Sequence, residues 1–117
     1  MTLPLPSISD FNDYKDPQEI RNFLRNQNCT HCHLDWRDPL DWLQKTPSKI
    51  LHADKKILGM LSMPADFPHQ HWVRFFSVQK NINYFYVWEK LFSSICQSYP
   101  FDENDLITAL CYANWME

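Results

Sequence analysis

The chain contains a single glycine, Gly59, among its 117 residues. Walker-type phosphate loops, G-x-G-x-x-G dinucleotide turns and collagen repeats all need several glycines, because other residues cannot reach the required backbone angles without a Cβ clash. The sequence therefore excludes these three classes. Aromatic residues make up 15% of the chain and hydrophobic residues 44%, so we expect one globular domain with a substantial core.

The charge balance is slightly acidic, with 11 Lys and Arg against 14 Asp and Glu and a net charge of −3. Nucleic-acid affinity depends on the neutralisation of phosphates by a basic face, so no nucleic-acid partner is expected. No apolar run approaches the roughly 18–20 residues that a membrane span needs. Residues 1–10 also lack the pattern of a secretory signal. We therefore expect a cytoplasmic protein without membrane contact.

The pattern along the chain predicts three helices and four strands. Residues 1–15 are expected to form an N-terminal arm with a short strand or turn, and a single domain is expected to cover residues 16–117. Asp-Pro starts, proline stops and apolar spacings of three and four residues predict the helices, which cover residues 16–27, 38–46 and 83–99. Short apolar or β-branched runs predict the strands, which cover residues 49–53, 56–63, 72–78 and 106–112.

The connections between these elements predict the fold class. The short turn between residues 49–53 and 56–63 favours antiparallel pairing, whereas the helix at 83–99 is long enough to cross over between parallel strands. In residues 56–63 both alternating faces are apolar, which is typical of a strand in the middle of a covered sheet. We therefore expect an α+β fold with a mixed, mostly antiparallel sheet and helices packed on it.

The most conspicuous motif is Cys29-Thr30-His31-Cys32-His33, which we expect in a loop between the first two helices. Its C-x-x-C-H spacing is that of c-type haem attachment, and two cysteines with one histidine are ligands of the kind that zinc prefers. A closed zinc site needs four ligands, however, and no second pair with this spacing follows in the sequence. A coincidental pair of thiols is the favoured interpretation, so neither metal nor haem is expected.

Two further histidines, His69 and His71, flank Gln70 just before the third predicted strand. Alternation would place both on one side, where they form a candidate metal pair with His52. No carboxylate follows at a fixed offset, so a solvated loop is the favoured interpretation. No G-x-S-x-G motif, and no Cys–His pair with an orienting group, occurs either. These patterns therefore indicate no catalytic residue.

Residues 50–78 resemble the second to fourth strands of the GNAT superfamily of N-acetyltransferases. The likeness rests on a strand that ends in a charged turn, on Ile57-Leu58-Gly59-Met60-Leu61, which is similar to the family's I-x-G-x-L pattern, and on a later strand that ends at Val78 before a helix. The segment from His31 to Leu43 also looks like one found in a bacterial subgroup of GNAT-like proteins. The resemblance covers about residues 16–117 and implies a GNAT-like fold.

This resemblance implies that acetyl-CoA binds where the third strand ends and the last helix begins. In the family, main-chain amides of this loop hold the pyrophosphate, which is an anion at a helix N-terminus. Gln79 matches the first position of the family's loop motif, Lys80 adds positive charge, and asparagine tolerates left-handed backbone geometry better than most residues. The implied cofactor-binding residues are Phe76, Ser77, Val78, Lys80, Asn81 and Asn83.

The implied activity is acyl transfer from acetyl-CoA to an amine. A GNAT domain continues past the strand at 106–112 with another helix and two strands, so we expect either a longer natural protein or a partner copy that completes the sheet at its open edge. For the 117 residues alone we expect weak or no catalysis. One alternative is a non-catalytic protein-interaction or dimerisation module on a GNAT-like scaffold. A third hypothesis is a zinc or redox module built on Cys29 and Cys32.

Overall fold

The computed structural model describes residues 5–26, 29–32, 39–54, 56–67, 69–101 and 103–108. The strands are β1 (Ser7–Asp10), β2 (Cys29–Cys32), β3 (Ser48–Ala53), β4 (Lys56–Ser62), β5 (Ala65–Phe67), β6 (Gln70–Trp72), β7 (Phe75–Val78) and β8 (Leu106–Thr108). The helices are α1 (Pro17–Arg25), α2 (Pro39–Leu43) and α3 (Tyr84–Ser98), and a short 3-10 helix covers Phe11–Asp13. In the described part of the chain, no helix combines the length and the apolar character that a membrane crossing would require.

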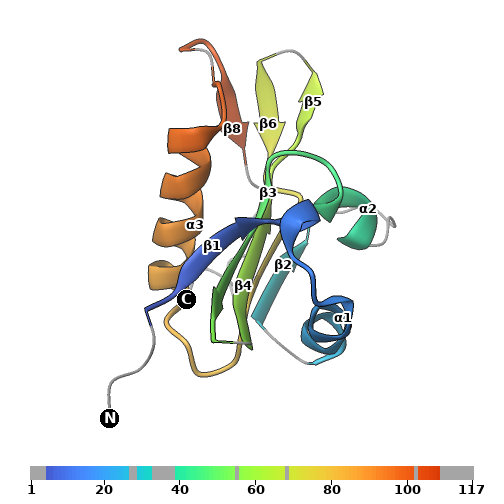
Figure 1. The fold of residues 1–117 in the computed structure, drawn as a ribbon. Coiled ribbons are helices and arrows are strands. Elements are labelled where there is room, and N and C mark those ends of the chain that lie inside the picture. Colours follow the sequence, from blue (N-terminus) through green and yellow to red (C-terminus); the bar gives the residue numbers. More distant parts are fainter. Residues whose placement is uncertain are drawn as a thin grey trace.

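The strands form two sheets that meet end to end. The larger sheet has five strands in the order β1-β3-β4-β7-β2, and every neighbouring pair in it is antiparallel. The smaller sheet has the order β5-β6-β8, in which β6 and β8 are parallel. Figure 1 shows the smaller sheet at one end of the molecule, where β5 follows β4 and β6 leads into β7. The predicted α+β class with a mostly antiparallel sheet is confirmed. Helix α3 does lead to a parallel pair, but β8 pairs with β6 in the smaller sheet and not with β7, the strand that directly precedes the helix.

Three details of the predicted elements are wrong. The strand expected at 72–78 is divided at Val73 and Arg74 into β6 and β7, which belong to different sheets. The segment between the strands expected at 56–63 and 72–78, for which no strand is predicted, contains β5, which pairs with β6. The C-x-x-C segment is strand β2, which pairs with β7, rather than a loop. Short strands such as β2 and β5 form because their backbone groups pair with a neighbouring strand. No local sequence pattern indicates this pairing, so such strands are difficult to predict.

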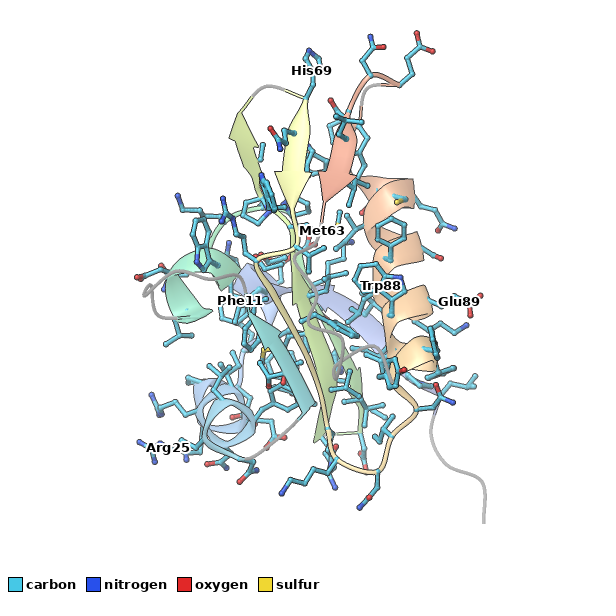
Figure 2. The ribbon with its side chains drawn as sticks, turned by 180° about the vertical axis from the view of Figure 1, so that it is seen from behind. Phe11, Arg25, Met63, His69, Trp88 and Glu89 are labelled. Carbon is cyan, nitrogen blue, oxygen red and sulfur yellow. The ribbon has the colours of Figure 1, made fainter. Side chains whose placement is uncertain are left out.

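Two hydrophobic cores cover the two faces of the larger sheet. In Figure 1, α3 lies on one face and α1 and α2 lie on the other. Figure 2 shows Trp88 of α3 on the side of the sheet and Glu89 on the outside. Strand β4 serves both cores, because Leu61 is buried under α3 and Met60 is buried under α1 and α2. The prediction that this strand is central and covered on both faces is confirmed.

The starts of α1 and α3 follow from local capping. The carboxylate of Asp16 accepts a hydrogen bond from the Glu19 amide at 3.0 Å, and Pro17 is the first helical residue, as the sequence predicts. The Asn83 side chain accepts from the Tyr86 amide at 3.1 Å and caps α3. Each cap satisfies an amide that the helix itself leaves unpaired. Both helices therefore begin where the sequence predicts.

Gly59 lies in β4 at the point where α3 comes closest to the sheet. A Cβ atom at this position would overlap Cγ1 of Val87 and would lie 3.1 Å from the carbonyl oxygen of Ser77. The register of the β3–β4 pair also shifts beside it, between Leu51 and His52. Glycine inside a strand often marks a bulge or a close approach, and both occur here. The single glycine is therefore explained by the close packing of α3 against β4.

Candidate functional site

A large pocket lies where the turn between β3 and β4 meets the loop between β7 and α3. Asn22 and Arg25 of α1 border the same space, as do Asn26, which directly follows this helix, and Tyr86 of α3. The volume is about 1580 Å³. Ligand pockets for small molecules typically measure roughly 300–1,000 Å³, so this one has room for a cofactor-sized molecule.

The loop between β7 and α3 has an ordered backbone. The Gln79 amide donates to the carbonyl of Leu58 at 2.9 Å, and the Ile82 amide donates to the Gln79 carbonyl at 3.3 Å. Between them, Asn81 adopts a φ of 69°, in the left-handed region that asparagine tolerates. This turn leads to Asn83, which caps α3, so the loop delivers the helix N-terminus to the pocket.

The side chains of this pocket combine amides with a small excess of positive charge. In the orientation that satisfies both its ends, the Gln79 carboxamide donates to the Ile57 carbonyl at 3.1 Å and accepts from Nζ of Lys56 at 2.8 Å. Lys56 is thereby held at the pocket. The lining includes three cations and two anions, which are Arg25, Lys56, Lys80, Glu19 and Asp54. The lining is therefore more positive than the chain as a whole, whose net charge is −3.

One of the two acids in the pocket has a structural partner. Oε1 of Glu19 accepts a hydrogen bond from the Ile57 amide at 3.2 Å, which joins α1 to β4. This bond fixes the carboxylate of Glu19 against β4. The three cations of the lining still outnumber its two acids, and this charge balance favours a ligand that carries negative charge.

The six cofactor-binding residues implied by the resemblance fall into two groups. Lys80, Asn81 and Asn83 line the pocket together. The other three belong to β7 and are buried, and they are Phe76, Ser77 and Val78.

Strand β7 has partners along both of its edges. It pairs with β4 on one side and with β2 on the other, over residues 75–78 in both cases. The hydroxyl of Ser77 lies 2.7 Å from that of Thr30 in β2, and the ring of Phe76 meets Trp88 edge-on at 5.3 Å. Both the backbone and the side chains of β7 are therefore engaged in the fold.

The C-x-x-C pair lies along an extended edge strand. Cys29 is opposite Val78 and Cys32 is opposite Phe75 in the antiparallel ladder. The histidine of the hypothesis is either His31, which belongs to β2, or His33, which lies outside the described residues. Within the described ranges, no three side chains of His, Cys, Asp or Glu are arranged to hold a metal ion. The zinc and redox hypothesis built on this pair stays a prediction.

His52 belongs to a small polar cluster on the edge of the larger sheet. Its Nε2 lies 2.8 Å from the hydroxyl of Ser9, and the ring of Tyr14 meets it edge-on at 5.1 Å. Burial lowers the pKa of His52. Burial also raises the pKa of Tyr14, and the charges of Glu19 and Asp16 add to that rise. His52 is therefore neutral near pH 7 and can accept the Ser9 hydroxyl proton in a hydrogen bond.

His69 and His71 meet a carboxylate that the sequence patterns did not indicate. Asp105, 36 residues after His69, lies 2.8 Å from the Nδ1 of that histidine and 3.7 Å from Nε2 of His71. The expectation of a solvated loop is wrong for His71, which is buried in β6. The crossover through α3 brings Asp105 to β6, and no fixed sequence offset could report that contact.

No protein-family model matches this sequence, and a search of curated proteins finds no significant match. The class that the fold defines is an α+β protein with a five-stranded antiparallel sheet, helices on both faces and a smaller mixed sheet at one end. The pocket is therefore the feature from which a function can be argued.

Proposed function

We propose that this chain is a GNAT-like domain that binds an acetyl-CoA-type ligand at the loop between β7 and α3. The observation that carries the proposal is the conformation of this loop. Asn81 takes the left-handed conformation, Asn83 caps the helix that follows, and both line the pocket beside Lys80. Amides at a helix start and a nearby ammonium group attract phosphate oxygens, so this end of the pocket suits the pyrophosphate of the ligand.

The rest of the pocket suits the remainder of such a molecule. Asn22, Asn26 and Gln79 offer both donors and acceptors, and Tyr86 offers an aromatic ring. Lys56, held by Gln79, is a second cation for a further phosphate oxygen. A ligand with several phosphates and a polar heterocycle uses all of these groups, whereas a small anion would use only the loop.

The reaction that belongs to this ligand is acyl transfer to an amine, which depends on positioning and on a base that removes the ammonium proton. In the GNAT family the pantetheine arm lies in a V-shaped split of the sheet. Here β2 pairs with β7 along residues 75–78, on the edge away from β4. We therefore propose that the chain binds the ligand through the loop and transfers the acyl group weakly or not at all.

Calorimetric titration with acetyl-CoA tests the binding step. We expect submillimolar affinity for the native chain and a loss of about tenfold for Lys80→Gln, because a charge-assisted hydrogen bond is removed. Asn81→Gly should bind as well as the native chain, since glycine adopts the same left-handed geometry. Lys15→Gln removes an equal charge from an exposed residue before α1 and serves as the matched control.

Two results would count against this proposal. If the native chain does not bind acetyl-CoA at concentrations up to millimolar, acetyl-CoA is not its ligand. If the native chain and Lys80→Gln bind with equal affinity, the loop between β7 and α3 is not the binding site. Transfer is measured separately as release of free thiol with a panel of amines. Rapid thiol release by the native chain would show that the pairing of β2 with β7 does not prevent transfer.

A second candidate function is a protein-interaction or dimerisation module on the same scaffold. Strand β8 lies at the end of the strand order β5-β6-β8 in the described residues, and its Leu106 and Ile107 are 66% and 39% exposed. Exposed apolar side chains on an edge strand favour pairing with another chain. Light scattering over a hundredfold range of concentration tests this candidate. A mass that stays at one chain throughout would exclude self-association as the function.

A further inference from the structure

The carboxylate of Asp105 lies between two histidines of the smaller sheet. Its Oδ1 is 2.8 Å from Nδ1 of His69, and its Oδ2 is 3.7 Å from Nε2 of His71. The side chains of Asp105 and His71 are only 9% and 4% exposed, whereas that of His69 is 56% exposed. Asp105 directly precedes β8, and the two histidines flank the first residue of β6. These contacts therefore join β8 to the β5–β6 hairpin.

The His71 ring faces an acceptor at each of its nitrogens. Nδ1 lies 3.0 Å from the carbonyl oxygen of Met63, and Nε2 faces Asp105. A neutral imidazole has one N–H, which suffices for the hydrogen bond to the Met63 carbonyl, whereas the protonated ring also directs a charged N–H toward the carboxylate at ion-pair distance. The rings of Tyr99 and Phe101 pack edge-on against His71, at centroid distances of 5.5 and 4.7 Å. Because the site is buried, water cannot offset the repulsion between the lone pair of a neutral ring nitrogen and the carboxylate.

His69 occupies a turn position where its backbone is strained. Its φ is 65°, in the left-handed region that glycine or asparagine usually fills. Figure 2 shows the residue at the tip of the hairpin. Its ring contacts Asp105, and its carbonyl accepts from the Leu106 amide at 2.7 Å. Both contacts are made with residues at the beginning of β8. The stabilisation that they provide offsets the energetic cost of the strained backbone.

We propose that Asp105, His69 and His71 form a proton-dependent clasp that holds β8 against β6 in mildly acidic solution and loosens as the pH rises. The pairing that it supports is short, because β6 and β8 match over only three residue pairs, Gln70 to Leu106, His71 to Ile107 and Trp72 to Thr108. The charged contacts of Asp105 therefore reinforce a short backbone pairing. Loosening frees the edge of β6 and increases the exposure of the two apolar residues of β8.

The direction of the pH effect follows from the charges at the clasp. An aspartate carboxyl group loses its proton at a lower pH than an imidazolium ring does. The clasp needs the charged carboxylate together with protonated rings, so it is strongest in mildly acidic solution. A higher pH favours the neutral ring of His71, in which the N–H that faces Asp105 is lost. A further titratable group at the clasp is Tyr99, whose ring packs on His71, and Glu103 is an exposed residue two positions before Asp105.

Amide hydrogen exchange measured by NMR on the full 117-residue chain tests the clasp. We expect the protection of the amides at 106–108, corrected for the intrinsic effect of pH, to fall about tenfold between pH 5.5 and pH 8. The amide of Leu91, which lies in the buried face of α3, is the internal reference for global unfolding and should not lose protection over this range. Asp105→Asn should lower β8 protection about tenfold at pH 5.5 and remove the pH dependence.

Two further variants make the test selective. Glu103→Gln removes a negative charge from the same loop and should keep the native pH dependence. His69→Asn keeps a residue that tolerates φ near 65°, so it should fold. This variant should lower β8 protection severalfold at both pH values and retain the part of the pH dependence that His71 causes. If Asp105→Asn does not fold, His69→Asn and the native pH series still decide the question.

The clasp is disproved if native β8 protection is the same at pH 5.5 and pH 8. It is also disproved if Asp105→Asn keeps the native pH dependence, or if His69→Asn leaves β8 protection unchanged. A loss that the Leu91 amide shares equally would show global unfolding and would likewise overturn a local clasp.

Discussion

The two sheets of this protein are stabilised by different kinds of contact. The larger sheet lies between two cores of fully buried aliphatic and aromatic side chains, with helices over both faces (Figure 1). The smaller sheet has three strands of three residues each, and its edge strand β8 exposes Leu106 and Ile107. Polar contacts from Asp105 hold that edge. We therefore expect damage to the larger sheet to be global and damage to the smaller one to be local.

The largest expected effect comes from truncating a core residue of the larger sheet. Leu61 is 0% exposed under α3, so Leu61→Ala should reduce the free energy of unfolding by about 2–5 kcal/mol through lost burial and a residual cavity. Ile107→Ala in β8 removes a half-exposed side chain and should cost less than about 1 kcal/mol. Urea unfolding followed by tryptophan fluorescence measures both. Equal losses would contradict the division between the two sheets.

A smaller global effect is expected at the close approach of α3 to β4. Gly59→Ala should destabilise the protein by about 1–3 kcal/mol, because the added Cβ overlaps Cγ1 of Val87. Val87→Ala removes that atom, so the double variant should be less destabilised than the sum of the two single ones. A double-mutant cycle in urea measures this coupling. Additive effects would mean that the backbone shifts to accommodate the new methyl group.

Much of the larger sheet could be predicted because its signals are local. The β3–β4 hairpin follows from two apolar runs around a charged turn, and the position of β4 follows from apolar residues on both of its faces. The start of α1 follows from Asp16 and Pro17. Strand β2 could not be predicted in this way. Its four residues do not alternate, and Cys29 pairs with Val78, which is far away in the sequence.

The candidate sites show the same limit. Lys80, Asn81 and Asn83 are predicted from the resemblance to the GNAT superfamily, and these three residues line one pocket. Arg25 lies on the other side of the pocket, and no local pattern relates the end of α1 to that loop. Asp105 was missed for the same reason, since only the crossover through α3 brings it to the histidines. Rules based on residue spacing in the sequence cannot predict contacts between side chains that only the chain topology brings together.

The smallest expected effect is a pH dependence that runs in opposite directions in the two regions. Burial lowers the pKa of His52, in the larger sheet, below its ordinary value of 6.5. The unfolded chain therefore takes up the proton first as the pH falls. The contribution of neutral His52 to stability is complete above about pH 6.5 and is lost as the pH falls through the folded pKa. Because the ring is only partly buried, we expect the effect to be less than about 1 kcal/mol.

His52→Gln should remove this acid sensitivity, so its free energy of unfolding in urea should fall less than that of the native chain between pH 7.5 and pH 5. Ser9→Ala removes the hydroxyl that contacts Nε2 of His52 but leaves the titrating ring, and it should keep the acid sensitivity. The clasp at Asp105 has the opposite sign, because β8 is held more tightly toward pH 5.5. A pH series on one sample therefore separates the regions: global stability should decrease toward acid while local protection of β8 increases. If both quantities moved in the same direction, the two histidine sites could not be independent.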